Sequence, residues 1–279
     1  MPVMLLVVVC YTMCALNDKY AVSRAHFDRS ELMFLMASGT VFFLAFTLPF
    51  SELSFEWSWK ILIPISLITL CKYTEFAVLP AILSNMTPFQ LKSWVGLTLC
   101  MSYFTDVIFY DTALSVPGLG FVILTFAGLA LTARAGRVST DYRKIWILLL
   151  LYISAKFGYG LIMRSTKEIF PNTLTLYAAL VILALISLPR ISFKKMLAKP
   201  EGKKGVLIVM LAKLPNTAGL LGENYTAARS LSNYSFIQPL ILISLFVSAV
   251  IDRRNRPTRL AVIGGLVTVA GIVGFQLAK

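Results

Sequence analysis

Long apolar segments recur along the chain and constrain its fold more than any motif does. A helix needs about 20 apolar residues to cross the hydrocarbon layer of a bilayer, and ten segments come close to that length. The first has no basic segment before it and no small-x-small cleavage site after it, so we expect a membrane helix rather than a cleaved signal. The ten segments cover 4–16, 32–50, 61–84, 94–110, 114–133, 145–163, 173–189, 205–222, 234–251 and 260–278.

The composition favours the same interpretation. Hydrophobic residues make up 58% of the chain and charged residues 14%, and the mean hydropathy is +0.79. Soluble domains are roughly half apolar and about a quarter charged. We therefore expect an all-α integral membrane protein with ten transmembrane helices, which crosses the plasma (inner) membrane many times.

The net charge of +13 is unevenly distributed between the loops. The odd-numbered connections carry 18 lysines and arginines, six of them within 190–205, whereas the opposite side of the membrane carries five. Positive residues stay on the cytoplasmic side, so we expect 190–205 in the cytoplasm and both termini outside. Because an anionic lipid leaflet is a sufficient partner for basic loops, we expect no nucleic-acid partner.

The two halves of the sequence resemble each other. Tyr11 and Lys72 recur as Tyr152 and Lys213 at a constant offset of 141 residues. Further matches are LPF at 48–50 with LPR at 188–190, and TFAGLAL at 125–131 with TVAGIVG at 268–274.

These matches predict two five-helix repeats, 1–138 and 139–279. An odd number of helices in each repeat forces the second copy to enter the membrane upside down. Such inverted repeats are typical of secondary transporters, which bind their substrate near mid-membrane between the repeats.

Four short motifs carry a family resemblance. MTPFQLK at 86–92 and FIQPLIL at 236–242 place a proline near the start of the fourth helix of each half. YDTALSVPG at 110–118 and IDRRNRPTR at 251–259 place an aspartate shortly before the last helix. With ten helices in two halves, the chain resembles the EamA-like branch of the drug/metabolite transporter superfamily. The usual Gly-Glu before the last helix is replaced by Tyr-Asp and Ile-Asp.

The resemblance implies a central cavity lined by the first four helices of each half, with the fifth helices packed at the periphery. Small residues in the last helix, Ala270-x-x-x-Gly274, suit such close packing. ALNDK at 15–19 also resembles the GALNK motif of nucleotide-sugar transporters.

Five charged residues lie within the expected helices, where each costs about 2.5–3.5 kcal/mol unless it is paired, neutral or next to water. Lys72 and Glu75 are one turn apart and can pair within their own helix. Lys156 and Lys213 have no acidic residue three or four positions away. Their partners must lie on other helices or in the substrate, or burial must lower their pKa until they are neutral. Glu223 is the fifth charge.

This asymmetry predicts different roles for the lysines. We expect Lys213, and to a smaller extent Lys156, to contact an anionic group of the substrate, while Lys72 mainly pairs with Glu75. Replacing Lys213 with methionine is expected to leave folding intact, because it strands no intrahelical partner.

Other polar residues near these charges are candidate ligands. Tyr73, Tyr159 and Tyr225 could stack on a substrate, although buried tyrosines also serve as packing residues. Asn17 and Asp18 follow the first apolar run. By comparison with the second repeat, the first helix should continue past them and place both on the cavity side. The alternative is a solvated helix end.

The sequence contains no recognisable catalytic motif. Tyr110-Asp111 followed by GLG at 118–120 resembles an intramembrane aspartyl protease, but Phe121 stands in place of the second aspartate that the dyad requires. No GxxxxGK phosphate-binding segment occurs. The four cysteines lie in expected helices without a second ligand group, so we expect no metal site. We therefore expect neither a cofactor nor an enzyme.

The sequence predicts a secondary active transporter that works by alternating access and exports a small polar organic metabolite, such as an amino-acid-like compound. Asp18, Glu75 or Glu223 could carry a coupling proton. The alternatives are an exporter of drugs or organic cations, a nucleotide-sugar antiporter and, more distantly, a membrane-embedded enzyme or an accessory subunit. We expect a monomer or weak homodimer whose partners are the bilayer and a small-molecule substrate.

Overall fold

A computed structural model describes residues 2–50, 58–110, 115–134, 142–166, 170–251 and 258–278, and every regular element in these ranges is a helix. The N-terminal part contains α1 (Pro2–Ser23), α2 (Arg29–Ala45), α3 (Leu62–Asn85), α4 (Pro88–Val95), α5 (Thr98–Phe109) and α6 (Val116–Arg134). The C-terminal part contains α7 (Tyr142–Thr166), α8 (Asn172–Ser187), α9 (Phe193–Ala198), α10 (Gly202–Leu211), α11 (Lys213–Arg229), α12 (Leu231–Ile251) and α13 (Arg259–Leu277). Three 3-10 turns are η1 (Leu48–Phe50), η2 (Trp59–Ile61) and η3 (Leu188–Arg190).

The described helices include five that are long and apolar enough to cross a membrane. They lie at Val3–Ser23, Trp59–Asn85, Lys144–Thr166, Asn172–Arg190 and Gly202–Arg229, and shorter apolar helices lie at Val116–Thr132 and Val262–Phe275. Large apolar side chains such as Leu5, Val9 and Met13 on α1 point outward, as expected of a surface that faces lipid. The expected all-helical fold, with several helices able to span a membrane, is thus confirmed for the described residues. The predicted repeat boundary at 138 and 139, and Asp111 and Asp252 of the family motifs, lie outside the described residues.

The helix expected at 94–110 starts earlier and is divided. Thr87 caps α4: the backbone N–H of Gln90 donates to the Thr87 hydroxyl at 3.2 Å, and the N–H of Thr87 donates to Oε1 of Gln90 at 3.0 Å. Pro88 follows at the first helical position, where no N–H is needed. Lys92, one of the 18 basic residues counted above in the odd-numbered connections, therefore lies in α4, and its assignment to a loop was wrong.

The helix expected at 205–222 also runs further. α10 and α11 follow each other around Ala212 and continue to Arg229, seven residues beyond the predicted end. The second part of this helix contains many polar residues, and several of these side chains are buried inside the protein, including Lys213, Thr217 and Glu223. Hydropathy falls there because the helix faces a polar interior, so the apolar run ends before the helix does.

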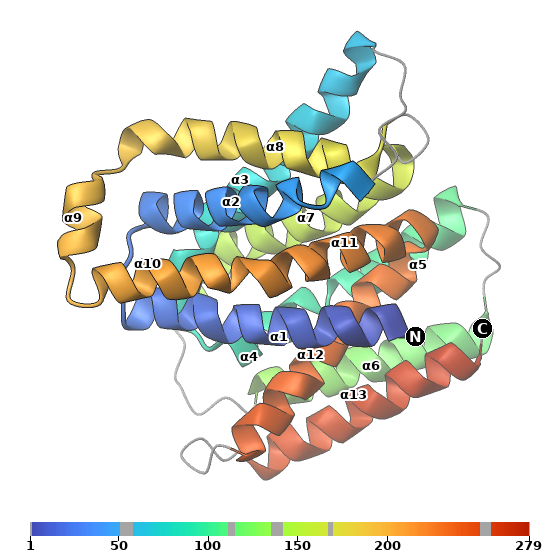
Figure 1. Ribbon diagram of the computed structural model, residues 1–279. Coiled ribbons are helices and arrows are strands. Elements are labelled where there is room, and N and C mark those ends of the chain that lie inside the picture. Colours follow the sequence, from blue (N-terminus) through green and yellow to red (C-terminus); the bar gives the residue numbers. More distant parts are fainter. Residues whose placement is uncertain are drawn as a thin grey trace.

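α6 and α13 form a closely packed pair, side by side in the lower part of Figure 1. A Cβ added at Gly128 would lie 2.5 Å from the backbone nitrogen of Thr268, and one added at Gly264 would lie 2.8 Å from the carbonyl of Gly128. The predicted Ala270-x-x-x-Gly274 interface is only partly correct. Gly274 packs on the ring of Phe121, but Ala270 is exposed, so the contact runs through other small residues.

The remaining long helices surround the interior of the protein. α3 packs on α7, α1 on α11, and α2 on α8. The chain termini lie at one end of the helices and α9 at the opposite end (Figure 1). The inner faces of α1, α3, α7 and α11 carry the buried polar side chains considered below.

Lys199 joins two turns at the end that carries α9. Its ammonium donates to Glu31 at 2.5 Å and to the carbonyl of His26 at 2.8 Å, and lies 3.3 Å from Asp28. Partial burial opposes its charge, but the hydrogen bonds to the two carboxylates outweigh this and raise the pKa of Lys199 above its ordinary value. The turn after α9 is thereby fixed to the turn before α2.

Candidate functional site

A small cavity, part of which is open to solvent, lies among the interior helices. α1, α3 and α4 contribute most of the wall, and α2, α7, α8 and α11 complete it. Its apolar lining consists of Cys14, Ala15, Met36, Phe76, Leu79, Leu83, Pro88, Leu91, Leu180 and Leu220. Its polar lining consists of Tyr11, Asp18, Lys72, Glu75, Lys92, Tyr152, Lys156 and Asn216.

Helical spacing explains how single elements supply several lining residues. On α1, Tyr11, Cys14 and Asp18 recur every three or four positions and so share one face. Lys72 and Glu75 begin a similar stripe on α3. A polar stripe on a membrane helix must face protein or water rather than lipid, because lipid offers no hydrogen bonds.

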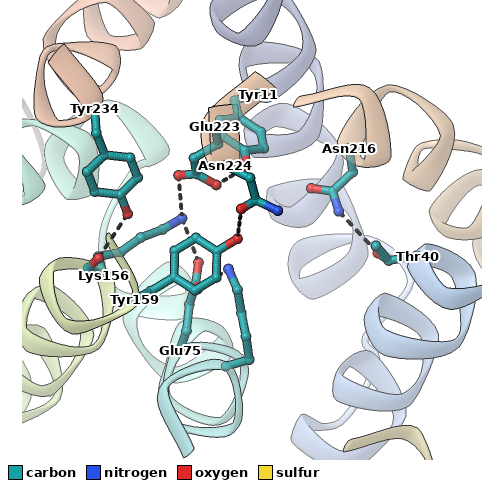
Figure 2. Close-up of polar contacts among 10 residues, drawn as sticks. Tyr11, Thr40, Glu75, Lys156, Tyr159, Asn216, Glu223, Asn224 and Tyr234 are labelled. Carbon is teal, nitrogen blue, oxygen red and sulfur yellow. Dashed lines mark hydrogen bonds and ion pairs between the residues drawn. The ribbon is translucent and has the colours of Figure 1, made fainter. Parts of the chain in front are cut away.

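Lys156 lies at the centre of a buried ion-pair network. Its ammonium is 3.1 Å from Oε1 of Glu75 on α3 and 3.5 Å from Oε1 of Glu223 on α11. The other oxygen of Glu75 is 3.0 Å from the ammonium of Lys72. Figure 2 shows Lys156 reaching between the two carboxylates. Two lysines and two glutamates thus alternate across three helices, which reduces the cost of burying each charge.

Tyrosines and an asparagine fix this network in place. Tyr11 donates its hydroxyl hydrogen to Glu223, and Tyr159 donates to the side-chain oxygen of Asn224. The hydroxyl of Tyr234 donates to the backbone carbonyl of Lys156 at 2.9 Å (Figure 2). The ammonium of Lys72 lies 4.0 Å from the centre of the Tyr159 ring, close enough for a cation–π contact.

A second ion pair joins α1 to α11. The ammonium of Lys213, which is fully buried, lies 3.3 Å from Oδ1 of Asp18. Gly39 on α2 permits close approach here, since a Cβ at that position would come within 2.9 Å of Lys213 Cγ. Near this pair, Asn216 donates to the hydroxyl of Thr40 at 3.1 Å (Figure 2).

Most of the charged residues selected from the sequence meet in this interior. The predicted Lys72–Glu75 pair is confirmed. The partners of Lys156 are Glu75 and Glu223, which lie on other helices. The interpretation of Lys213 needs correction. Its partner is Asp18 on another helix, so a Lys213→Met substitution would strand a buried carboxylate, and we expect it to destabilise the fold.

Asn17 and Asp18 lie inside α1, five or more residues before its end, which excludes the solvated helix end. Asp18 lines the cavity, whereas Asn17 does not. The Asn17 side-chain nitrogen is buried without a hydrogen-bond partner among the described residues.

Only one of the three selected tyrosines belongs to the network. Tyr159 is fully buried within it. Tyr73 instead accepts a long hydrogen bond of 3.4 Å from Arg190, outside the cavity. Tyr225 is 48% exposed and stacks under Arg229, 4.0 Å from the guanidinium. Proximity in sequence to Glu223 misled the prediction for Tyr225, because neighbouring residues on a helix point in different directions.

Several residues of the site were missed by sequence reasoning. Tyr11 and Tyr152 had been noted as equivalent repeat positions, and this equivalence was the signal that could have selected them. Lys92 follows a capping motif by one turn, which could have placed it in a helix. Asn216, Asn224 and Tyr234 carried no such signal, because uncharged polar residues are common in membrane helices. Among the described residues, no group of His, Cys, Asp and Glu could hold a metal ion.

Comparisons with known proteins show a similarity of fold. No family model and no curated protein matches the chain. Among solved structures 27 chains match, and one, described only as "Crystal structure of protein", covers 99% of this chain and 95% of its own length with a TM-score of 0.71. Its sequence identity is 12%, so the likeness is one of fold alone.

Proposed function

We propose that the protein is a secondary active transporter of a small polar organic metabolite, such as an amino-acid-like compound, and that it exports this metabolite across the plasma membrane. One observation carries the proposal: a cavity lined by Asp18, Lys72, Glu75, Lys92 and Lys156 lies inside an all-helical membrane protein. Ionisable groups inside a membrane protein are costly and by default indicate a pathway for ions or polar solutes.

Ten spans in two inverted repeats form part of this proposal. If α1 to α6 correspond to α7 to α13, then α3 corresponds to α10 and α11 together, and the observed contacts occur in equivalent pairs. The contact of α3 with α7 is equivalent to that of α1 with α11, and the contact of α3 with α8 is equivalent to that of α2 with α10 and α11. The pairs α2 with α8 and α6 with α13 are then their own equivalents. η1 and η3, which follow α2 and α8, begin with the same Leu-Pro dipeptide.

Two basic side chains support the same correspondence. Near the end of α1, Lys19 donates to the carbonyls of Leu83 and Met86 at the end of α3, at 2.5 and 3.4 Å. Near the end of α7, Arg164 donates to the carbonyl of Ala228 at the end of α11, at 3.1 Å. In both cases a basic side chain on the first helix of a half caps the C-terminal carbonyls of the third helix of the same half. Cations are favourable at helix C-termini.

The drug/metabolite transporter family remains our proposed assignment. Its expected plan has a cavity between the first four helices of each half and peripheral fifth helices. The lining supports this plan in part, because residues of the first three helices of both halves and of α4 line the cavity, whereas none of the described residues of α12 does. α6 and α13, the proposed fifth helices, contribute no residue to its wall.

Alternating access requires contacts between the halves that can break and re-form. In the proposed division, Lys156 pairs with Glu223 of its own half and Glu75 of the other. A rocking motion can separate Lys156 from Glu75 while Glu223 still holds it, so the lysine never faces the interior without a carboxylate. Asp18, Glu75 and Glu223 are the candidates for a coupling proton.

The lysines weigh against the organic-cation alternative. A cavity for hydrophobic cations needs carboxylates and aromatic faces. Here Lys72, Lys92 and Lys156 line the wall beside only Asp18 and Glu75.

A binding screen followed by a flux assay tests the proposal. Purified protein is heated with amino acids, amines, nucleotide sugars and lipophilic cations, and compounds that raise its melting temperature are assayed for counterflow in proteoliposomes. We expect flux of at least one stabilising compound, and its loss in Lys156→Met, with Lys194→Met on the exposed face of α9 as a control. Stabilising compounds that are chemically converted, or that bind without any flux, would contradict a transporter.

A further inference from the structure

The ion-pair network has an incomplete counterpart in the other half of the chain. Lys72 on α3 and Lys213 on α11 are 141 residues apart. The ammonium of Lys72 lies 4.0 Å from the centre of the Tyr159 ring, and that of Lys213 lies 3.3 Å from Oδ1 of Asp18. Asp18 and Tyr159 are also 141 residues apart, so the two lysines contact equivalent positions. The offset seen in the sequence therefore relates contacts in the interior as well.

The same offset relates two further pairs of positions in the cavity wall, and here the side chains differ. Glu75 is equivalent to Asn216, and Lys156 is equivalent to Ala15. In one set, the ammonium of Lys156 lies 3.1 Å from Oε1 of Glu75. In the other set, Ala15 has only a methyl group, which leaves the equivalent ammonium missing. Because Ala15 and Asn216 both line the cavity, its open space borders the position of that missing ammonium.

Asn216 has a free acceptor beside this space. Its amide nitrogen donates to the Thr40 hydroxyl at 3.1 Å, and this hydroxyl donates its only hydrogen to the carbonyl of Met36 at 2.7 Å. The Thr40 oxygen must therefore accept from Asn216, which fixes the orientation of the amide. The amide oxygen of Asn216 lies on the side of the ion-pair network (Figure 2) and accepts no hydrogen bond from the described residues.

Asp18 has a second free acceptor. Lys213 contacts Oδ1 of Asp18, and no described residue donates to Oδ2. Asp18 lines the cavity and its side chain is 12% exposed, so Oδ2 is available to a ligand. Glu75 shows how a carboxylate in this interior can bind two cations, because Oε1 contacts Lys156 at 3.1 Å and Oε2 contacts Lys72 at 3.0 Å. Asp18 has one ammonium partner where Glu75 has two.

The two free acceptors border the same part of the cavity. Asn216 follows Lys213 by three residues on α11, which places both side chains on one face of the helix. Lys213 in turn contacts Asp18 on α1. At the same level, the thiol of Cys14 lies 3.6 Å from the carbonyl of Ala212, so α1 and α11 touch each other here. A small group that enters from the cavity therefore meets both acceptors.

Resting on the transporter function proposed above, we propose that the substrate carries a protonated primary amine, which binds at Oδ2 of Asp18 and the amide oxygen of Asn216. This ammonium takes the place that a lysine at position 15 would occupy if the two halves were identical. An ammonium has three hydrogens to donate, and hydrogen bonds between ionised partners are the strong ones. Lysines in the cavity wall repel a ligand that is only a cation, so the amine belongs to a zwitterion. The ligand class is that of amino acids and related zwitterions with a free amine.

A lysine introduced at Ala15 tests the site before any ligand is known. The ammonium of Ala15→Lys should reach the two acceptors as Lys156 reaches Glu75. Ala15→Met is the matched control, because it adds a side chain of similar length without a charge. We expect Ala15→Lys to melt at a higher temperature than Ala15→Met in detergent. A buried ammonium without acceptors is costly, so a site that cannot bind one would reverse this order.

Matched ligands test the amine of the substrate. The melting temperature of the native protein is measured over a range of concentrations of the common amino acids. Each amino acid that stabilises the protein is compared with its N-acetyl derivative and with the carboxylate that lacks the amine. Both counterparts lack the ammonium and should bind at least about tenfold more weakly, the lower value of a hydrogen bond to a charged group. Ala15→Lys should bind no amino acid, because its own ammonium occupies the site.

A substitution of Asn216 assigns the contact. Asn216→Leu removes the amide oxygen at similar volume and should weaken binding of a stabilising amino acid about 10- to 150-fold, the value of one hydrogen bond to a charged group. Lys194→Met removes a lysine from exposed surface and should leave the affinity unchanged. If Asn216→Leu cannot be purified folded, the two Ala15 variants and the ligand series decide.

Each outcome has a definite meaning. Equal binding of an amino acid and its N-acetyl derivative, stabilisation by no amino acid, or a lower melting temperature for Ala15→Lys than for Ala15→Met overturns the ammonium site. Amino-acid binding that survives in Asn216→Leu overturns the role of Asn216. Counterflow of a compound without an amine would leave the transporter function standing while the ammonium site fails. Binding of an amino acid without flux would do the reverse.

Discussion

Two helix contacts in this protein show opposite solutions to packing in a membrane. α6 and α13 meet through glycines and threonines, and a Cβ at Gly271 would come within 2.3 Å of Thr125. α1 and α11 meet partly through the ion pair between Asp18 and Lys213. The first contact uses small side chains to bring backbones together, as is common between membrane helices. The second places two full charges in the interior, where Lys213 is fully buried and Asp18 nearly so.

The first kind of contact keeps two helices at a fixed distance, whereas the second kind can exchange its partners. Close packing of backbones has one favourable distance and no alternative partner. An ion-pair network has alternatives, since Lys156 contacts Glu75 and Glu223 at similar distances of 3.1 and 3.5 Å. Buried charges are rarely the most stable way to fill an interior. Their concentration around the cavity, away from α6 and α13, is the physical basis for placing function there.

Breaking the ion pair should have the largest effect on stability. Lys213→Met leaves Asp18 buried beside an apolar side chain, and removal of one member of a buried pair typically costs about 3–5 kcal/mol. The double variant Lys213→Met with Asp18→Leu removes both charges and should recover most of that loss. Thermal unfolding in detergent measures both.

The double variant also separates structure from function. Recovery of stability without recovery of flux would mean that the pair serves transport. A single Lys213→Met variant as stable as the native protein would contradict the structural role of the pair.

Filling the glycine contact should have the next largest effect. In Gly128→Ala the new methyl group meets the backbone of α13, 2.5 Å from the nitrogen of Thr268, and backbone cannot rotate away. Overpacking of this kind typically costs about 1–3 kcal/mol. Gly265→Ala in α13 is the matched control, because nothing lies within 4 Å of its added Cβ. That variant should be neutral or gain up to about 1 kcal/mol from helix propensity.

Transport per folded molecule should be unchanged in both glycine variants, since neither residue lines the cavity. A Gly128→Ala variant that melts like Gly265→Ala would show that α6 and α13 are not held at the distance described. A folded variant with altered substrate affinity would instead extend the functional region to the periphery.

The general fold could be predicted from the sequence because a helix that crosses a lipid bilayer must be long and apolar. Apolar segments long enough to span a bilayer revealed nearly every long helix, and the cost of buried charge selected Lys72, Glu75, Lys156, Lys213 and Glu223, all of which lie in the interior. The pairing of Lys72 with Glu75 followed from helical spacing alone. These predictions succeeded because each depends on a large energy and a local pattern.

Contacts between segments far apart in the sequence could not be predicted from hydropathy or helical spacing. Asp18 and Lys213 are 195 positions apart, and Tyr11 and Glu223 are 212 apart, so no periodicity connects them. The end of α11 was missed because its buried polar residues lower hydropathy where the helix is most enclosed. Tyr73 and Tyr225 were selected for a weaker reason, namely adjacency in sequence, which says little about which face of a helix a side chain occupies.

Substitution of Tyr225 should have the smallest effect on stability, because this residue lies on α11 outside the buried network. It follows Glu223 by two residues, yet its ring is half exposed and contacts Arg229 rather than the cavity. Tyr225→Leu should change stability by no more than about 0.5 kcal/mol, as surface substitutions usually do, and should leave ligand affinity unaltered. Tyr159→Phe is the contrasting variant, because it strands the buried side-chain oxygen of Asn224 and should cost about 1–3 kcal/mol. Equal melting temperatures for the two variants, or a loss of binding confined to Tyr225→Leu, would place the functional face of α11 on its other side.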